Sequence, residues 1–322
     1  MTFRNRMVGA FFVGLAALGP APAAAAEIVF GITSATAFSL PHYIAAEKKF
    51  YETEGVAVDS IVIGSANAVL QQLAAGSLNI GQAATDQALR AIMRGAPLRM
   101  VAGAASNAPF RLIGAKTVKD WSDLKGKTIS VGGPTDVTLY FLRVMARKNG
   151  LADSDYDLIY AGGTPARFAQ LASGAVAAAM LTNPNDFTAL EQGYVDLGSV
   201  PRYLPGWAQN NMVVDTRWAA KNRPAILAFL RAQIRATRFF YDTANRDETI
   251  AILAKYTKVS TAIATTTYDF YVEQKVVARD SAMSPDGIKL NIDALVAMGE
   301  LKQAPPLDAF IDPSLLAEAS KP

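Results

Sequence analysis

The sequence of 322 residues predicts an α/β protein of two lobes, each a mainly parallel sheet flanked by helices. Three observations lead to this prediction. Strand-like and helix-like segments alternate from residue 28 to residue 181, the pattern of one half recurs in the other, and 51% hydrophobic residues allow a sizeable core. Alternation favours parallel sheets because two adjacent parallel strands need a crossover connection, usually a helix.

The start of the chain, residues 1–26, has the composition of a secretory signal peptide. Arg4 and Arg6 give it a basic start, residues 7–18 are apolar, and the small residues Ala24–Ala26 end it. The alternative is an anchor helix, but this apolar run is short of the roughly 20 residues that span a bilayer. We expect export to a bacterial periplasm with cleavage near Ala26, and without Cys no lipid anchor is possible.

The composition excludes several kinds of chemistry. The chain has no Cys and one His, so a disulfide scaffold, a thiol nucleophile and a multi-His metal site are excluded. Residues 1–26 contain 2 of the 31 basic residues and none of the 28 acidic ones, so the mature net charge is 29 minus 28, or +1. This balance leaves no basic surface for nucleic acid. We predict no metal and no cofactor.

A sequence repeat joins the two halves. Residues 72–76 (QLAAG) recur 98 residues later at 170–174 (QLASG). Strand, helix and strand surround each copy in the same order, and one further strand and helix precede each copy. The strand-like segments are 28–32, 61–64 and 78–81 in the first half and 128–132, 159–162 and 176–181 in the second. Two β-α-β-α-β units predict two lobes, the alternative being chance similarity between Ala-rich helices.

The rest of the sequence is predicted to be helical. Apolar residues recur at helical spacing, and Pro224 and Pro285 lie near the starts of two of these segments. We expect the helices to cover and brace the first lobe. They are predicted at 218–243, 246–256, 260–276 and 285–299.

The candidate ligand site lies in the loops that follow the strands. In open parallel sheets these loops form the crevice, and the next helices point their N-termini into it. Ser, Thr, Asn and Gly dominate these loops, and free N–H groups at helix starts can hold a carboxylate or sulfonate without a Lys cluster. The candidate ligand-binding residues are Ser34, Thr36, Phe38, His42, Ser65, Thr85, Asp86, Thr135, Asp136, Thr138, Thr164, Arg167, Asn183, Asn185 and Trp207.

Each candidate also has a structural explanation. Ser, Thr, Asp and Asn before helices are common N-caps, and aromatic side chains often only pack. His42, in the first turn of a helix, suits packing as well as ligand contact. Arg167 follows residues 162–165 in a first helical turn, where a cation opposes the helix dipole. We interpret it either as the charge partner of a ligand or as part of an ion pair that stabilises the lobe.

Several motifs resemble those of the nitrate/sulfonate/taurine-type periplasmic binding proteins of ABC transporters. The likeness runs from about Glu27 to Leu316. The chain departs from the family pattern at Asn79 and Ala177, where the family usually has Asp. The motifs are PHYIAAEKKFY at 41–51, EGV at 54–56, LAAGSLNIG at 73–81, RGAPL at 94–98, DLKGKTI at 123–129 and LASGAVAAA at 171–179.

The resemblance implies a type II, Venus-flytrap receptor. Such a monomer closes two lobes on a small molecule and delivers it to an ABC permease. The few formal charges of the loops and the available aromatic side chains favour a small organic anion, aromatic ones included. The implied crossovers near 106–111 and 203–207 would divide the chain into lobe 1 (27–107 with 205–322) and lobe 2 (108–204).

Other functions stay open at this stage. A binding protein for a thiamine-pyrimidine precursor and an envelope ligand sensor are the main alternatives. The related precursor synthases use a Cys-rich motif, which a chain without Cys lacks. The Ser122–Lys125 pattern (Ser-x-x-Lys) lies in a turn before a strand, where capping explains it better than catalysis. A transcription regulator of the LysR type would carry a helix-turn-helix in place of residues 1–26.

Overall fold

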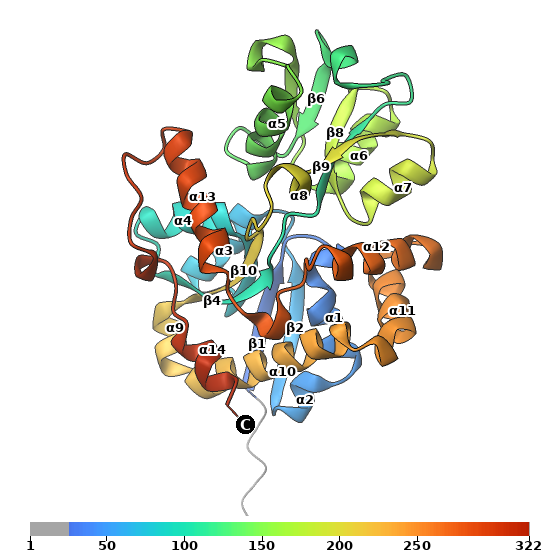
Figure 1. Ribbon diagram of the computed structural model, residues 1–322. Coiled ribbons are helices and arrows are strands. Elements are labelled where there is room, and N and C mark those ends of the chain that lie inside the picture. Colours follow the sequence, from blue (N-terminus) through green and yellow to red (C-terminus); the bar gives the residue numbers. More distant parts are fainter. Residues whose placement is uncertain (1–25, 322) are drawn as a thin grey trace, which may run out of the picture.

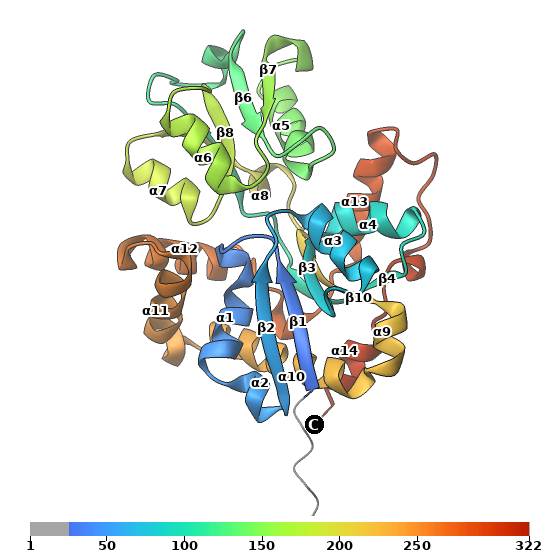
Figure 2. The ribbon, with the colours of Figure 1, turned by 180° about the vertical axis from the view of Figure 1, so that it is seen from behind.

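The computed structural model describes residues 26–321 and shows two lobes, each built on a five-stranded sheet (Figures 1 and 2). The predicted signal peptide lies outside the described residues, except that Ala26 begins the first strand. The lobe 1 sheet has the order β2-β1-β3-β10-β4, from β1 (Ala26–Ile32), β2 (Val56–Val62), β3 (Ile80–Ala84), β4 (Leu98–Ala105) and β10 (Asn210–Asp215). The lobe 2 sheet has the order β7-β6-β8-β5-β9, from β5 (Phe110–Gly114), β6 (Thr128–Val131), β7 (Asp157–Tyr160), β8 (Ala178–Thr182) and β9 (Val195–Ser199).

Each sheet is mixed, because one strand runs against its neighbours. β1 pairs in parallel with β2 and β3, whereas β10 is antiparallel to β3 and β4, with Val213 opposite Gly81. In lobe 2, β5 is antiparallel to β8 and β9. Both reversed strands directly follow a crossover between the lobes, so they enter their sheet from the other lobe. The two-lobed α/β prediction is confirmed, with sheets less parallel than expected.

Helices flank both sheets. In lobe 1 they are α1 (Leu40–Glu47), α2 (Phe50–Thr53), α3 (Ala66–Ala75), α4 (Thr85–Met93), α9 (Thr216–Lys221), α10 (Arg223–Tyr241), α11 (Arg246–Thr257), α12 (Thr261–Glu273), α13 (Pro285–Ala297) and α14 (Ser314–Ala319). In lobe 2 they are α5 (Val137–Lys148), α6 (Thr164–Ala172), α7 (Asn185–Glu191) and α8 (Val200–Tyr203). No helix of residues 26–321 is long and apolar enough to cross a membrane.

The repeated QLAAG and QLASG segments end equivalent helices. Gly76 and Gly174 adopt left-handed φ angles of 78° and 76°, which glycine reaches without strain. Their N–H groups donate to the carbonyls of Leu73 and Leu171, at 3.0 and 3.1 Å. The letters therefore recur because both helices, α3 and α6, stop in the same way before a strand.

Each lobe has its own apolar core. In lobe 1, Phe30 of β1 and Phe229 of α10 are fully buried, with ring centroids 5.2 Å apart. In lobe 2, the buried Phe141 of α5 lies 5.7 Å from the ring of Phe110. The C-terminal helices pack on lobe 1, as Figure 1 shows for α10 and α14. The predicted helix 218–243 is broken at Asn222, where α9 ends and α10 begins.

Two short segments join the lobes, residues 106–109 before β5 and residues 204–209 before β10. The Gly206 N–H donates to the Asn107 side-chain oxygen at 2.8 Å, so the two segments are bonded to each other. A second lobe–lobe contact joins Phe187 of α7 to Phe270 of α12, whose rings lie edge to face 5.6 Å apart. Movement between the lobes must therefore pivot near the first contact and alter the second.

Candidate functional site

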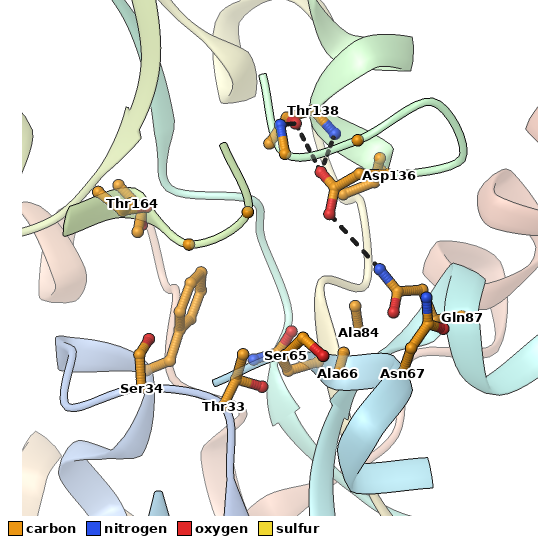
Figure 3. Close-up of a pocket in the computed structure, with 18 of the residues that line it drawn as sticks. Thr33, Ser34, Ser65, Ala66, Asn67, Ala84, Gln87, Asp136, Thr138 and Thr164 are labelled. Carbon is orange, nitrogen blue, oxygen red and sulfur yellow. Dashed lines mark hydrogen bonds between the residues drawn. The ribbon is translucent and has the colours of Figure 1, made fainter. Parts of the chain in front are cut away.

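A pocket of about 270 Å³ lies between the lobes, close to the lower end of the roughly 300–1,000 Å³ typical of small-molecule sites. Its walls are the loops after β1, β2 and β3 of lobe 1 and after β6 and β7 of lobe 2. The first residues of the reversed strands, Phe110 and Asn210, complete it. The strand ends of both lobes thus face one shared cavity (Figure 3).

The structure brings many of the predicted residues together in this lining. They are Ser34, Thr36, Phe38, Ser65, Thr135, Asp136, Thr138, Thr164 and Arg167. Several capping roles also hold, because Ser65 accepts the Ala68 N–H at 3.2 Å and Asp136 accepts the Thr138 N–H at 2.9 Å. Capping and lining are compatible here, since the capped helix starts point toward the cavity.

The remaining candidates of lobe 1 lie outside the lining, in buried contacts of their own. His42 is bonded through Nδ1 to the Tyr51 hydroxyl at 2.8 Å, and its burial lowers its pKa to about 4. Thr85 accepts a hydrogen bond from Asn211 at 2.7 Å. Asp86 pairs with Arg90, and its burial raises its pKa to about 6. These side chains hold lobe 1 together behind the pocket wall.

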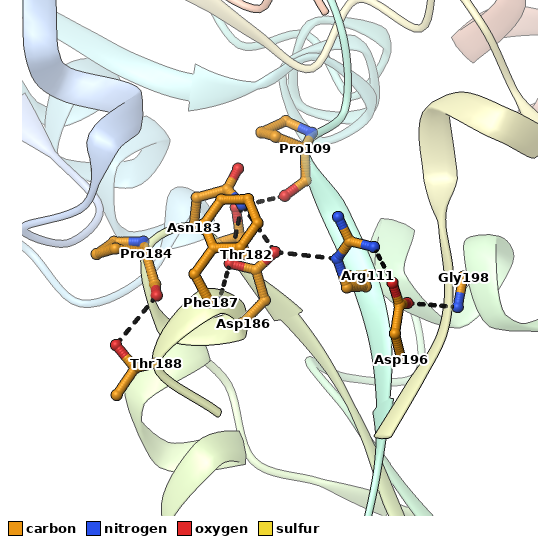
Figure 4. A network of polar contacts seen from close by, with 10 residues as sticks. All are labelled: Pro109, Arg111, Thr182, Asn183, Pro184, Asp186, Phe187, Thr188, Asp196 and Gly198. Atoms are coloured by element: carbon orange, nitrogen blue, oxygen red, sulfur yellow. Dashed lines mark hydrogen bonds and ion pairs between the residues drawn. The ribbon is translucent and has the colours of Figure 1, made fainter. Parts of the chain in front are cut away.

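Asn183 and Asn185 also lie outside the lining, and Asn183 belongs to a second polar network (Figure 4). Asn183 donates to both carboxylate oxygens of Asp186, at 2.8 and 2.7 Å, while Asn185 begins α7. Arg111 lies 3.4 Å from the same carboxylate, and burial raises the pKa of Asp186 to about 6. The network therefore anchors α7 to β5.

Trp207 also lies outside the lining, with 1% of its surface exposed. Its ring stacks on Tyr140 at 5.5 Å and meets Phe141 edge to face at 5.1 Å. The indole packs the crossover segment 204–209 onto α5. Of the two roles that the sequence allowed for Trp207, ligand contact and packing, the structure shows packing.

Arg167 does not form the lobe-stabilising ion pair that the sequence left open as its structural explanation. It is 3% exposed and forms no ion pair with a carboxylate of residues 26–321. Its nitrogens donate to the Met180 carbonyl at 2.6 Å, to the Gly162 carbonyl and to the Thr164 hydroxyl at 2.8 Å. Burial lowers its pKa to about 10, so it stays protonated at neutral pH. No carboxylate among the described residues contacts this buried cation at the edge of the pocket, although the charge of Asp136, which lines the same pocket, opposes the fall of its pKa.

The sequence interpretation missed several polar residues of the lining. They are Gln82, Gln87, Gln209 and Asn210, whereas Thr33, Ser39 and Thr182 were not singled out but fall within the predicted strand-end loops 33–39 and 182–185. Gln82 is inside β3, where it donates to the Phe38 carbonyl at 2.9 Å. Gln209 and Asn210 reach the pocket because β10 pairs with β3, with Asn210 opposite Ala84. Only long-range pairing places them there, so local sequence carries no signal for them.

One wall of the pocket is apolar. The rings of Phe38 from lobe 1 and Phe110 from lobe 2 lie 6.0 Å apart. Aromatic faces at this position can accommodate an apolar or aromatic part of a ligand.

Sequence comparison places this site in a known family. The profile of the family described as NMT1/THI5 like matches residues 37–246, which include most of the pocket lining. The chain belongs to the NMT1/THI5-like family. A relative from Schizosaccharomyces pombe, named 4-amino-5-hydroxymethyl-2-methylpyrimidine phosphate synthase, is 32% identical over 131 residues. That match covers 40% of this chain and 37% of the yeast protein, so the chain aligns with well under half of its relative.

Solved structures show that this family member has the fold of periplasmic binding proteins. A ligand-binding component of an ABC-type import system from Staphylococcus aureus superposes with a TM-score of 0.79 at 14% identity, over 92% of this chain and 99% of that one. The alkanesulfonate-binding protein SsuA from Xanthomonas axonopodis pv. citri, bound to MOPS, gives 0.72 at 20% identity, over 91% and 97%. At these identities the likeness establishes the fold, and the ligand remains to be argued from the pocket.

Proposed function

We propose that the protein is an exported solute receptor that captures a small organic anion between its lobes and delivers it to an ABC permease. The observation that carries this proposal is the pocket itself, which both lobes line with strand-end loops and helix starts. A ligand there contacts both lobes at once and favours the closed arrangement of a two-lobed fold.

The anionic group of the ligand is argued from the lobe 2 side of the pocket. Arg167 is a buried cation without a carboxylate contact among the described residues, and α6 starts beside it at Thr164. Asp136 acts on this charge without contacting it, and an anion in direct contact would offset more of the cost of burying the guanidinium. A carboxylate or sulfonate is therefore favoured at this end, with Phe38 and Phe110 beside its apolar part.

The experiment is a thermal-shift screen of the mature chain, residues 27–322, against carboxylates, sulfonates and pyrimidines. A ligand at 100 times its Kd adds about 2.7 kcal/mol to the unfolding free energy. Small-angle scattering with each hit should then show a more compact particle. If no organic anion stabilises the protein, or if hits leave the scattering unchanged, the receptor proposal is wrong.

An uptake experiment in cells distinguishes a transport receptor from a sensor. We propose export through residues 1–26 and uptake through a permease, so deleting the gene should abolish uptake of the labelled ligand. Normal uptake in the deletion strain would instead favour an envelope sensor. N-terminal sequencing of the periplasmic protein tests cleavage near Ala26.

A second candidate ligand is a thiamine-pyrimidine precursor. The family match and the name of the Schizosaccharomyces pombe relative favour it. We infer binding rather than synthesis, because the chain has no Cys for the Cys-rich motif of the synthases. The screen therefore includes 4-amino-5-hydroxymethyl-2-methylpyrimidine, and stabilisation by this compound alone would replace the organic anion.

A further inference from the structure

One side of the pocket presents acceptor oxygens that protein donors do not fill. Asp136 Oδ1 accepts the Thr138 N–H at 2.9 Å and the Thr138 hydroxyl at 2.5 Å. Its other oxygen, Oδ2, receives only a long contact of 3.5 Å from Gln87 Nε2. Both Asp136 and Gln87 line the cavity. The free side of this carboxylate therefore faces the space that a ligand would occupy.

Two carboxamide oxygens add to this group. The side-chain oxygens of Gln87 and Gln209 are buried and receive no hydrogen bond from any residue between 26 and 321. The two side chains are only 8% and 3% exposed, and both line the same pocket. The contact of Gln87 Nε2 with Asp136 fixes which end of the Gln87 amide is the free acceptor. Buried acceptors are normally satisfied, so these oxygens call for a donor that the protein does not supply.

The acceptors and the cation occupy different parts of the cavity. Figure 3 shows Asp136 and Gln87 together on one side of the pocket and Thr164, a bonding partner of Arg167, on the other. A ligand with only an anionic group would satisfy the second region and leave the first empty. Placed against Asp136, the same anionic group would be repelled.

We propose that Asp136, Gln87 and Gln209, here called the acceptor cluster, bind an N–H donor group that the ligand carries opposite its anionic group. This inference rests on the proposed function and specifies its ligand as a small amino-bearing organic acid. Asp136 belongs to lobe 2, whereas Gln87 belongs to lobe 1 and Gln209 ends the crossover segment 204–209. An N–H group in the cluster therefore bonds both lobes and stabilises their closure.

The test uses matched probes with the mature chain. Calorimetry compares 4-(aminomethyl)benzoate with 4-methylbenzoate, and 4-aminobutyrate with butyrate. The member with the ammonium group should bind at least tenfold more tightly in at least one pair. 4-Aminobenzoate against benzoate asks whether a neutral aromatic amine suffices, and benzylamine supplies the ammonium without the anion.

Asp136→Asn tests the residue itself. Asn is as good an N-cap as Asp, so α5 should keep its start while the charge is lost. The matched control is Asp157→Asn, an exposed carboxylate at the start of β7 in the same lobe. We expect Asp136→Asn to lose at least tenfold in affinity for the ammonium probe and Asp157→Asn to lose none. Gln87→Met, which removes an acceptor without touching the cap, should also weaken the ammonium probe.

The outcomes separate this inference from the proposed function. Equal affinity within every pair, or unchanged affinity in folded Asp136→Asn and Gln87→Met proteins, overturns the acceptor cluster and leaves an organic-anion receptor. Binding of benzylamine as tightly as the amino acids supports the cluster and overturns the anionic half of the proposed function. No binding of any probe, together with no hit among the carboxylates and sulfonates of the screen, overturns both.

Discussion

The contact between α7 and α12 makes a quantitative prediction about lobe closure. Phe270 of lobe 1 meets Phe187 of lobe 2 edge to face, with ring centres 5.6 Å apart. The Arg111 guanidinium lies 5.9 Å from the ring centre of Phe270 and 5.7 Å from that of Phe187. Phe270→Ala removes both interactions across the lobe boundary. An aromatic pair adds about 0.5–1.5 kcal/mol and a cation–π contact about 0.5–1 kcal/mol, so the loss is about 1–2.5 kcal/mol.

This loss should open the protein without unfolding it. At about 1.4 kcal/mol per tenfold, the ratio of closed to open molecules falls about 5- to 60-fold. Apparent ligand affinity falls with the closed population if only that form binds tightly. Small-angle scattering of the ligand-free protein measures the opening, and calorimetry with a ligand from the screen measures the affinity.

The control is Val272→Ala, two residues along the same helix at a side chain that is 37% exposed. It should leave both the scattering curve and the affinity unchanged. If Phe270→Ala also leaves them unchanged while the protein stays folded, the contact does not influence closure and the reasoning is refuted.

Two further predictions concern the buried charges. Arg90→Met leaves the buried Asp86 without its cation and should lower the unfolding free energy by about 3–5 kcal/mol in urea titrations, whereas the exposed Arg94→Met should cost under about 1 kcal/mol; equal effects would show that the pair is not structural. Burial raises the pKa of Asp186 to about 6, and an unfolded Asp has a pKa of about 4. Its contribution to stability is therefore complete below pH 4 and lost as the pH rises through 6, an unfolding free energy change on the order of 3 kcal/mol. Asp86 and His42 titrate over the same range, so the test is the difference between two proteins: in urea titrations from pH 4 to 7 the stability of the wild type should fall relative to that of Asp186→Asn, and parallel curves would contradict the assignment.

Local sequence predicted the two lobes, six of the ten strands in residues 26–321 and the loops of the site, but it did not predict β4, β5, β9 and β10, which lie outside the repeated units. Hydrophobic periodicity and the glycines that end α3 and α6 are local signals, so they predicted both lobes and the lining at Ser65, Asp136 and Thr164. β5 and β10 run antiparallel to their neighbours because each follows a crossover from the other lobe. No local sequence pattern predicts this direction. Gln209 lines the pocket because β10, which follows it, pairs with β3, and no local pattern predicts this pairing.

The sequence also could not predict which polar side chains are buried in contacts within the protein. Asp86 has its partner Arg90 one helical turn later, a spacing visible in the sequence, but the second carboxylate that binds Arg90, Glu300, comes from a distant part of the chain. Trp207 is an aromatic residue of the kind that can form the wall of a ligand pocket. Its ring instead packs onto Tyr140, and this contact depends on where the crossover segment lies against α5. In both cases a residue type suited to a ligand was used by the protein itself.

The two copies of the repeat agree where they build the fold and differ where they meet the pocket. Leu73 and Leu171 are both buried at equivalent positions of α3 and α6. At the helix starts, Asn67 corresponds to Pro165 by the same offset of 98 residues, and Pro165 has no N–H to offer a ligand. Val69, fully buried in lobe 1, corresponds to Arg167, which adds a charge to lobe 2. Two chemically equivalent lobes would suit a symmetric ligand. These differences make the two sides of the pocket chemically different, so the pocket can orient an asymmetric ligand whose two ends differ.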